Sequence, residues 1–329
     1  MTVRLRPNRV RRTYFGGRRI DAFTGMPATC TDGVPRPEDW MASTVTAFNG
    51  TDEIRNEGLG RLEDGRFVRD VVGDLPFLVK LLDSDERLVI QAHPSVSCAQ
   101  RLFGSSVGKT ECWYFLPGTD ADAYVYLGFR QGVTRTDWEQ AVLDYRLKRN
   151  SESPPLRSFH ENNPLLPFLH RIAVKAGDFV FVDGGVPHAI GAGCFMVELQ
   201  EPSDLMVVAE CVTPSGRSIP ESKIHGGLGW DMMFDVYTYG GLPFDEICAR
   251  YVRRAVDGLC ICGSELTDRF AMWRMDGCGY LELSRSACVI VTDGAGEVNG
   301  LGVKKGDRIL VADERNLVTK GDATLVICA

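Results

Sequence analysis

The chain contains 329 residues, of which 44% are hydrophobic and 25% are charged, and this composition is typical of a globular protein. Its 37 basic and 44 acidic residues give a net charge of -7, which argues against a nucleic-acid-binding or membrane-surface protein because such proteins are usually basic. The 35 glycines and 16 prolines predict many turns, and therefore many short strands rather than a few long helices.

The sequence also indicates where the protein resides. Its N-terminal region is rich in arginine but lacks the apolar stretch of a secretory signal, and no run approaches the ~18 apolar residues of a membrane span. The 11 cysteines lack the regular paired spacing of a disulfide scaffold, so we interpret them as reduced thiols. We expect a cytoplasmic protein that binds neither nucleic acid nor membranes, and the sequence indicates no particular protein partner.

Short strands bounded by Asp, Gly or Pro dominate the chain from residue 75 onward. They are predicted over residues 77–82, 87–92, 112–116, 123–127, 172–174, 178–182, 195–199 and 206–209. One helix interrupts them, because Thr136 and Glu139 match a capping box and apolar residues then recur at helical spacing until Pro154. We assign this helix to an insertion at about 131–170.

The pattern changes near residue 243. A helix is predicted over 244–255, and short strands separated by Asp-Gly or Gly-Asp turns follow from 269 to 329. We therefore predict a larger β domain at 1–243, which contains the insertion, and a smaller β sandwich or cupin-like domain at 244–329.

Two overlapping motifs suggest chemistry that the surrounding residues do not support. Residues 104–108 match the G-x-S-x-G turn of serine hydrolases, and with the following Lys-Thr they approach a phosphate-binding loop. Both motifs require a helix to follow, whereas residues 111–115 have strand composition. The phosphate loop also requires Gly where this chain has Phe103, so we reject both interpretations.

Four side chains from three segments form the strongest chemical pattern. Gln91 and His93 lie two residues apart at the end of a predicted strand and so point to the same face, while Glu111 opens another strand. His188 ends a segment that begins at Gly177 and nearly matches the second cupin motif, G-x5-P-x-G-x2-H, with Asp in place of Pro. Two imidazoles, a carboxylate and an amide oxygen suit Zn²⁺ with water in an open position.

Several ordered segments carry a family resemblance. Residues 77–83, 90–94, 108–114, 187–194 and 198–204 closely resemble type I mannose-6-phosphate isomerases, and Phe15-Gly16-Gly17 stands where that family has Trp-Gly-Gly. The resemblance covers most of residues 7–210. It implies a mainly β fold, with a cupin jelly-roll β-barrel core, a helical insertion and a smaller C-terminal β domain.

The resemblance also implies a zinc-dependent isomerase that interconverts mannose 6-phosphate and fructose 6-phosphate through an enediolate. One zinc ion per chain is expected on Gln91, His93, Glu111 and His188, the set that the spacing indicates. Lys80 and Lys109 are expected to face the active site, and Lys109 and Thr110 to bind the sugar phosphate. Two lysines near zinc repel each other, so one can act as a neutral general base while the other binds phosphate.

This chain departs from the family at one arginine. The family has Arg four residues after the Asp that corresponds to Asp204, whereas this chain has Val208. Arg217, in the following loop, is the predicted substitute and is assigned a catalytic role. Two alternatives remain open: a related isomerase that acts on another sugar, and a cupin that binds a sugar or sugar phosphate without catalysis.

Overall fold

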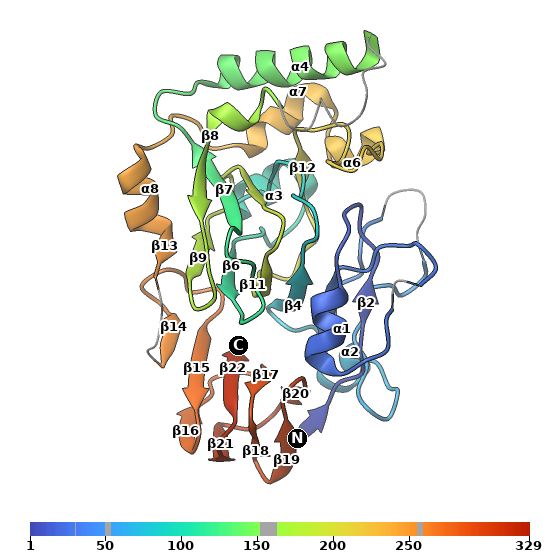
Figure 1. Cartoon of the computed structure of the whole chain (residues 1–329), viewed down its shortest axis with the longest axis vertical. Coiled ribbons are helices and arrows are strands. Elements are labelled where there is room, and N and C mark those ends of the chain that lie inside the picture. Colours follow the sequence, from blue (N-terminus) through green and yellow to red (C-terminus); the bar gives the residue numbers. More distant parts are fainter. Residues whose placement is uncertain (30, 50–53, 152–162, 255–258) are drawn as a thin grey trace.

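The computed structural model describes residues 1–329 except 30, 50–53, 152–162 and 255–258. Figure 1 shows two β-rich parts stacked along the long axis, with helices over the upper end and both termini in the lower part. The predicted fold class is confirmed, because strands dominate and are arranged in several sheets.

The upper part is built on two facing antiparallel sheets. The seven-stranded sheet has the order β13 (Val252–Arg253), β9 (Phe179–Val182), β6 (Glu111–Phe115), β11 (Phe195–Gln200), β4 (Leu78–Asp83), β3 (Glu38–Met41) and β2 (Arg9–Val10). The five-stranded sheet has the order β12 (Val207–Val208), β5 (Gln91–Ala92), β10 (His188–Ile190), β7 (Tyr124–Phe129) and β8 (Leu169–Ala173). Every residue of β4, β6 and β11 is buried, because both faces of the central strands are covered.

The lower part is a sandwich of two further sheets. One has the order β1 (Thr2–Arg4), β20 (Arg308–Val311), β17 (Ala287–Asp293), β22 (Thr324–Cys328), β15 (Met272–Asp276) and β14 (Cys260–Cys262). The other has the order β16 (Gly279–Glu282), β21 (Asn316–Gly321), β18 (Ala295–Val298) and β19 (Leu301–Lys304). Aliphatic side chains from both sheets form one core.

Two strand pairs cross the domain boundary predicted near residue 243. Strand β1 of the N-terminus pairs with β20, and β13 pairs with β9 of the seven-stranded sheet. A buried ion pair between Asp39 and Arg308 also joins the two parts. The division at 243 stays a prediction, and the N-terminal strand contributes to the sheet of the C-terminal part.

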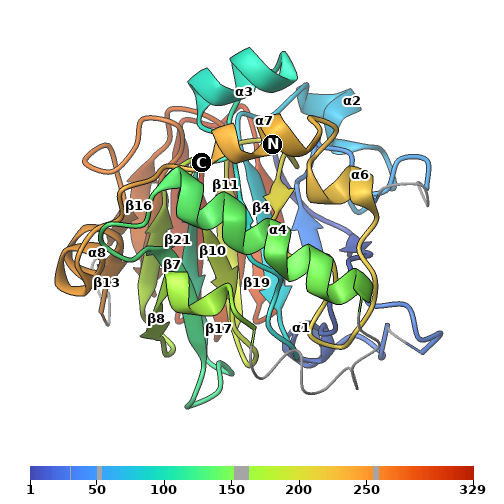
Figure 2. The ribbon, with the colours of Figure 1, turned by 90° about the horizontal axis from the view of Figure 1, so that it is seen from above.

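Helices lie mainly outside the sheets. They are α1 (Arg18–Thr24), α2 (Val68–Val72), α3 (Val96–Phe103), α4 (Arg135–Ser151), η1 (Leu166–Phe168), α6 (Glu221–Ile224), α7 (Trp230–Met233), η2 (Phe234–Val236) and α8 (Phe244–Tyr251). Figure 2 shows α4 lying across the upper end of the molecule, where Trp138 and Tyr145 pack beside Phe234 in one apolar cluster. Within the described residues, no helix combines the length and apolar character needed to cross a bilayer.

Three details of the sequence prediction are corrected. Helix α4 begins two residues earlier than expected, because the side chain of Thr134 exchanges hydrogen bonds with Asp137. Helix α8 ends at Tyr251, where the chain turns into β13. The last residues of the predicted insertion belong to β8, while residues 152–162 of that insertion and residue 255 lie outside the described part of the chain.

The Phe-Gly-Gly motif has a steric reason that yields a stability prediction. Gly16 has a φ of +157°, and a Cβ added there would lie 1.8 Å from the carbonyl oxygen of Asp83. Replacing Gly16 with Ala should therefore lower the free energy of unfolding by about 3 kcal/mol, measured by urea denaturation. Replacing Gly104, which has a φ of +64° and an open Cβ position, should cost only about 1 kcal/mol. Equal losses in the two variants would contradict the steric explanation.

Candidate metal centre and substrate cavity

Three of the predicted metal ligands meet between the two facing sheets. His93 follows β5 and His188 begins β10 of the five-stranded sheet, while Glu111 begins β6 of the seven-stranded sheet. Their ligand atoms all lie within 4.8 Å of one another, and each side chain is at most 1% exposed. The pairing of strands thus brings together residues that are separated by up to 95 positions in sequence, from His93 to His188.

Hydrogen bonds orient both imidazole rings toward Glu111. Nδ1 of His93 lies 2.9 Å from the carbonyl oxygen of Leu205, and Nδ1 of His188 lies 2.9 Å from that of Val186. A carbonyl oxygen only accepts, so each ring donates from Nδ1 and presents the lone pair of Nε2 to the carboxylate. The Nε2 atoms lie 3.2 Å (His93) and 3.4 Å (His188) from oxygens of Glu111.

The donor atoms of this cluster fit a bound metal ion. Oε2 of Glu111 and Nε2 of His188 are buried and lack a hydrogen-bond partner among the described residues. Burial, followed by the charge of Lys109, lowers the pKa of His93 to about 3, and burial also lowers the pKa of His188. Neutral imidazoles and an ionised carboxylate are the states that bind metal, so the cluster can hold a metal ion.

Gln91 is the fourth predicted ligand. It pairs directly with His188 across β5 and β10, and its side chain lines the cavity that adjoins the cluster. Because paired residues in neighbouring strands present their side chains on the same face, the side chain of Gln91 is on the same face of the sheet as that of His188.

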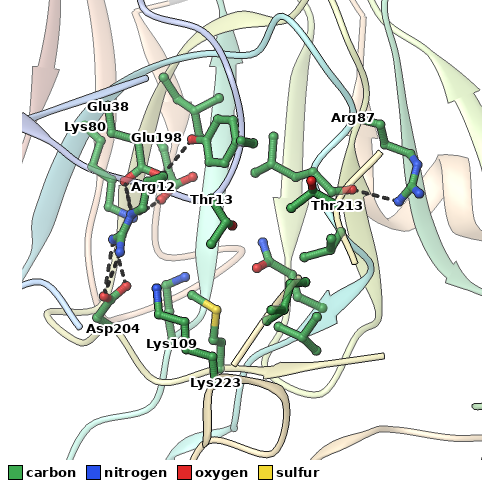
Figure 3. Close-up of a pocket in the computed structure, with 18 residues that line it drawn as sticks. Arg12, Thr13, Glu38, Lys80, Arg87, Lys109, Glu198, Asp204, Thr213 and Lys223 are labelled. Atoms are coloured by element: carbon green, nitrogen blue, oxygen red, sulfur yellow. Dashed lines mark hydrogen bonds and ion pairs between the residues drawn. The ribbon is translucent and has the colours of Figure 1, made fainter. Parts of the chain in front are cut away.

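A cavity with many charged side chains opens beside the metal cluster (Figure 3). The basic residues that line it are Arg12, Lys80, Arg87, Lys109 and Lys223. The acidic residues that line it are Glu38, Glu198 and Asp204. Arg87 is bound to the buried carboxylate of Glu210, which does not line the cavity, so the other four basic groups face three acidic ones. This excess of basic over acidic side chains in the cavity favours an anionic ligand.

Lys80 is firmly held. Its Nζ lies 2.6 Å from oxygens of both Glu198 and Gln200, and Gln200 donates from its amide nitrogen to two backbone carbonyls, which fixes its orientation. Burial opposes the charge of Lys80, but Glu198 and Glu38 outweigh burial and raise the pKa of Lys80. Lys80 is therefore a fixed cation of the cavity.

Lys109 contacts the metal cluster itself. Its Nζ lies 2.8 Å from Nε2 of His93 and 3.4 Å from Oε2 of Glu111. Burial and the charge of Lys80 lower the pKa of Lys109, against the opposing effect of Glu111. The ammonium group of Lys109 thus lies at the same nitrogen that would hold a metal ion.

The sequence analysis did not identify Arg12, a buried arginine of the cavity. Its guanidinium contacts Asp204 through both Nη atoms at 3.1–3.2 Å and donates from Nε to Glu38 at 3.0 Å. The partners of Arg12 lie 26 and 192 residues away in sequence, so no local motif marked it among the many arginines of the N-terminus. These contacts raise the pKa of Arg12 despite its burial.

Two other predicted site residues lie apart from this arrangement. Thr110 lines a second cavity and donates its backbone N–H to Glu201, so the structure does not bring it to the cavity of Lys80 and Lys109. Arg217 forms a 2.9 Å ion pair with Glu86 and stacks on the ring of Phe15, and it is about one third exposed. Val208, by contrast, does line the main cavity, and it is the position at which the family resemblance predicts an arginine.

Comparison with known proteins agrees with this geometry. The chain is 32% identical over 145 residues to the mannose-6-phosphate isomerase ManA of Bacillus subtilis, covering 44% of this chain and 37% of that protein. It is 31% identical over 136 residues to the mannose-6-phosphate isomerase of Streptococcus mutans, covering 39% of this chain and 34% of that protein. The matched part spans about a third of the length of these curated relatives. No family model matches the chain.

Solved structures match the whole chain. The mannose 6-phosphate isomerase of Bacillus subtilis superposes with a TM-score of 0.70 at 19% identity, covering 100% of this chain and 99% of that chain. The predicted resemblance is confirmed. The fold is therefore that of the mannose-6-phosphate isomerases. A structure of such an isomerase with zinc and yttrium bound has a TM-score of 0.69 at 16% identity, covering 99% of this chain and 98% of that chain.

Proposed function

We propose that this protein is a metal-dependent aldose–ketose isomerase that interconverts mannose 6-phosphate and fructose 6-phosphate. The observation that carries the proposal is the buried His93–Glu111–His188 cluster beside a cavity lined by Lys80 and Lys109, since Lys109 also contacts His93. Cation-lined cavities suit a phosphorylated ligand, and a metal beside lysines suits proton transfer next to a carbonyl group. The matches to mannose-6-phosphate isomerases support the same assignment.

We further propose that the metal is zinc, held by Gln91, His93, Glu111 and His188. Nitrogen and oxygen donors in this number suit zinc with an open coordination position. When bound, the ion would stabilise negative charge that develops on the sugar oxygens as the carbonyl group moves between C1 and C2. The reduced thiols that the sequence indicates favour the cytoplasm as the location of this enzyme.

The protein's own residues supply the remaining chemistry. The isomerisation moves a proton between C1 and C2, and a general base must take it up and return it. Lys109 is proposed for this role because its Nζ lies beside the metal ligands and is not held by a strong ion pair. Lys80 is proposed as the fixed cation that balances charge in the cavity, since Glu198 and Gln200 hold it in place.

Two alternatives remain because Val208 stands where the related isomerases have arginine. A related isomerase acting on another sugar would keep the metal and both lysines but recognise a different hydroxyl pattern. A non-catalytic cupin would bind a sugar or sugar phosphate without exchanging its protons. Lys80 and Lys109 both line the cavity, and Lys109 contacts the proposed metal ligand His93, which favours an enzyme over the binding protein.

The proposed activity is tested directly in a coupled assay. Zinc-loaded protein should convert mannose 6-phosphate to fructose 6-phosphate, and a chelator should abolish the conversion until zinc is restored. Conversion that persists in protein shown to be free of metal would contradict the metal dependence. Conversion of other sugar phosphates, with none of mannose 6-phosphate, would identify the first alternative.

A further inference from the structure

Lys223 differs from the other cations of the substrate cavity because, among the residues that the structure describes, no carboxylate forms an ion pair with it. It lies on α6, is half-buried, and lines the cavity of Lys80 and Lys109. Its Nζ donates a long hydrogen bond, 3.4 Å, to the amide oxygen of Asn49. In the described part of the chain, it forms no ion pair with Asp or Glu. A partly buried ammonium group without a counter-ion is costly unless a ligand supplies the negative charge.

The other basic side chains of the cavity already have polar partners within the protein. Lys80 is bound to Glu198, and Lys109 lies against the metal ligand His93. Arg12 is bound to Asp204 and Glu38, but these bonds use one N–H from Nε and one from each Nη. Of the five N–H groups of a guanidinium, two are thus left for a ligand.

In the described part of the chain, no hydrogen bond or ion pair joins Lys223 to a proposed metal ligand. The charged groups that act most strongly on Lys223 are Arg12, Asp204, Glu38 and Glu57, and none of these is a metal ligand. Lys223 also lines a neighbouring cavity with Asp204 and Met206, so the two cavities meet at its side chain. In a hexose 6-phosphate, the phosphate is on the carbon farthest from the reacting C1, so it must bind away from the metal.

We propose that Lys223, assisted by Arg12, binds the phosphate group of the substrate and thereby selects a phosphorylated sugar. This inference rests on the proposed function, because it assigns one end of the same cavity. Figure 3 shows Arg12, from the loop that follows β2, and Lys223, from α6, at the side of the cavity where Asp204 lies. Arg12 already neutralises Asp204, so that carboxylate does not repel the phosphate from Lys223.

The burial of Lys223 gives the proposal a pH dependence. Burial, followed by the charge of Arg12, lowers the pKa of Lys223 to about 8, against the opposing effects of Asp204, Glu38 and Glu57. The protonated form binds the phosphate, so affinity should be highest near pH 7 and fall as the pH rises toward 9. The facing carboxylates are ionised and Arg12 is protonated throughout this range, because their pKa values are shifted further away from it.

Binding of fructose 6-phosphate to the zinc-loaded protein tests the proposal by calorimetry, which does not require turnover. Lys223→Met removes the charge and keeps the length of the side chain, and it should raise the Kd at pH 7 by about ten-fold or more. Lys223→Arg should retain affinity and keep it at pH 9, where the wild-type protein loses it. Lys175→Met, which removes a charge from the exposed turn between β8 and β9, is the matched control and should bind like the wild type.

Further measurements separate phosphate binding from a structural role. In Lys223→Met, the KM for the sugar phosphate should rise while kcat changes little, and inorganic phosphate should lose its ability to inhibit. The melting temperature should not fall, since an unmatched cation has been removed from a partly buried position. A Kd and KM equal to those of the wild type would overturn the proposal.

The same data distinguish failure of this inference from failure of the proposed function. Binding that depends on Lys223 without any isomerisation would reject the enzyme and leave the phosphate site supported. Isomerisation with a KM that is unaffected by Lys223→Met would support the enzyme and reject the phosphate site.

Discussion

Replacing Glu111 with Gln, or His188 with Ala, should give a folded protein that contains little zinc and has lost its isomerase activity. Each change removes one donor from a buried cluster whose ligand atoms lie within 4.8 Å of one another. A bound ion would contribute several kcal/mol of charge stabilisation, so the rate should fall by about 10³-fold or more in these variants. Elemental analysis gives the zinc content, and circular dichroism shows whether the sheets are retained.

The control for these variants is another histidine. His225 follows α6, where it packs beside Trp230 and lies apart from the metal cluster. His225→Ala should therefore keep both zinc and activity. Stoichiometric zinc in both Glu111→Gln and His188→Ala would reject the assigned metal site.

Replacing Lys109 with Met should lower kcat by about 10²–10⁴-fold while the protein still binds zinc. Lys109 contacts the metal ligands but is not itself a ligand, and its Nζ is 3.4 Å from the nearest oxygen of Glu111. Its loss therefore removes the proposed proton carrier. It should not leave the charge of Glu111 unbalanced, because the bound zinc ion would compensate that charge. Steady-state kinetics together with zinc analysis measure the two effects separately.

Either of two results, loss of zinc or an unchanged kcat, would contradict this role for Lys109. If Lys109→Met lost zinc as completely as His188→Ala, Lys109 would be part of the metal site rather than the proton carrier. If it kept full kcat, another group would carry the proton. A substitution of Lys80 would not separate catalysis from stability. Removing Lys80 leaves the buried carboxylate of Glu198 without its partner and destabilises the fold.

The same kinetic measurement examines the catalytic role predicted for Arg217. Arg217 must release Glu86 to reach the cavity, because these two side chains are joined at 2.9 Å. A ten-fold or greater fall of kcat/KM in Arg217→Ala, about 1.4 kcal/mol, would support the predicted role. Unchanged kinetics would reject it and leave Arg12, which also lines the cavity, as a candidate for that role.

The sequence could indicate part of the candidate metal cluster because the spacing of Gln91 and His93 and the motif that ends at His188 are local features. The side-chain alternation of a strand fixes the common face of Gln91 and His93, and the spacing from Gly177 to His188 marks the cupin turn. Glu111 begins a strand of the other sheet, so the packing of the two sheets, rather than any single motif, brings it to His93 and His188.

The sequence cannot predict the charge arrangement of the cavity in the same way. Arg12 meets Asp204 across 192 residues, and no local spacing encodes that contact. Lys223 lies on the four-residue helix α6. This helix follows a long loop after β12, and the path of that loop cannot be predicted from local sequence spacing. The start of α4 was misplaced because Thr134 with Asp137 and Thr136 with Glu139 both match the capping pattern, and only the structure shows which pair is used.

Proton exchange in deuterated water tests the central claim most directly. Zinc-loaded protein is incubated with fructose 6-phosphate in deuterated water, and nuclear magnetic resonance follows deuterium at C1 and C2 together with the appearance of mannose 6-phosphate. An isomerase that transfers a proton through an enediolate should incorporate deuterium at the transferred position and form the product, and both should require zinc. Tight binding of fructose 6-phosphate, measured by calorimetry, with neither exchange nor product would contradict the account and identify a sugar-phosphate-binding cupin.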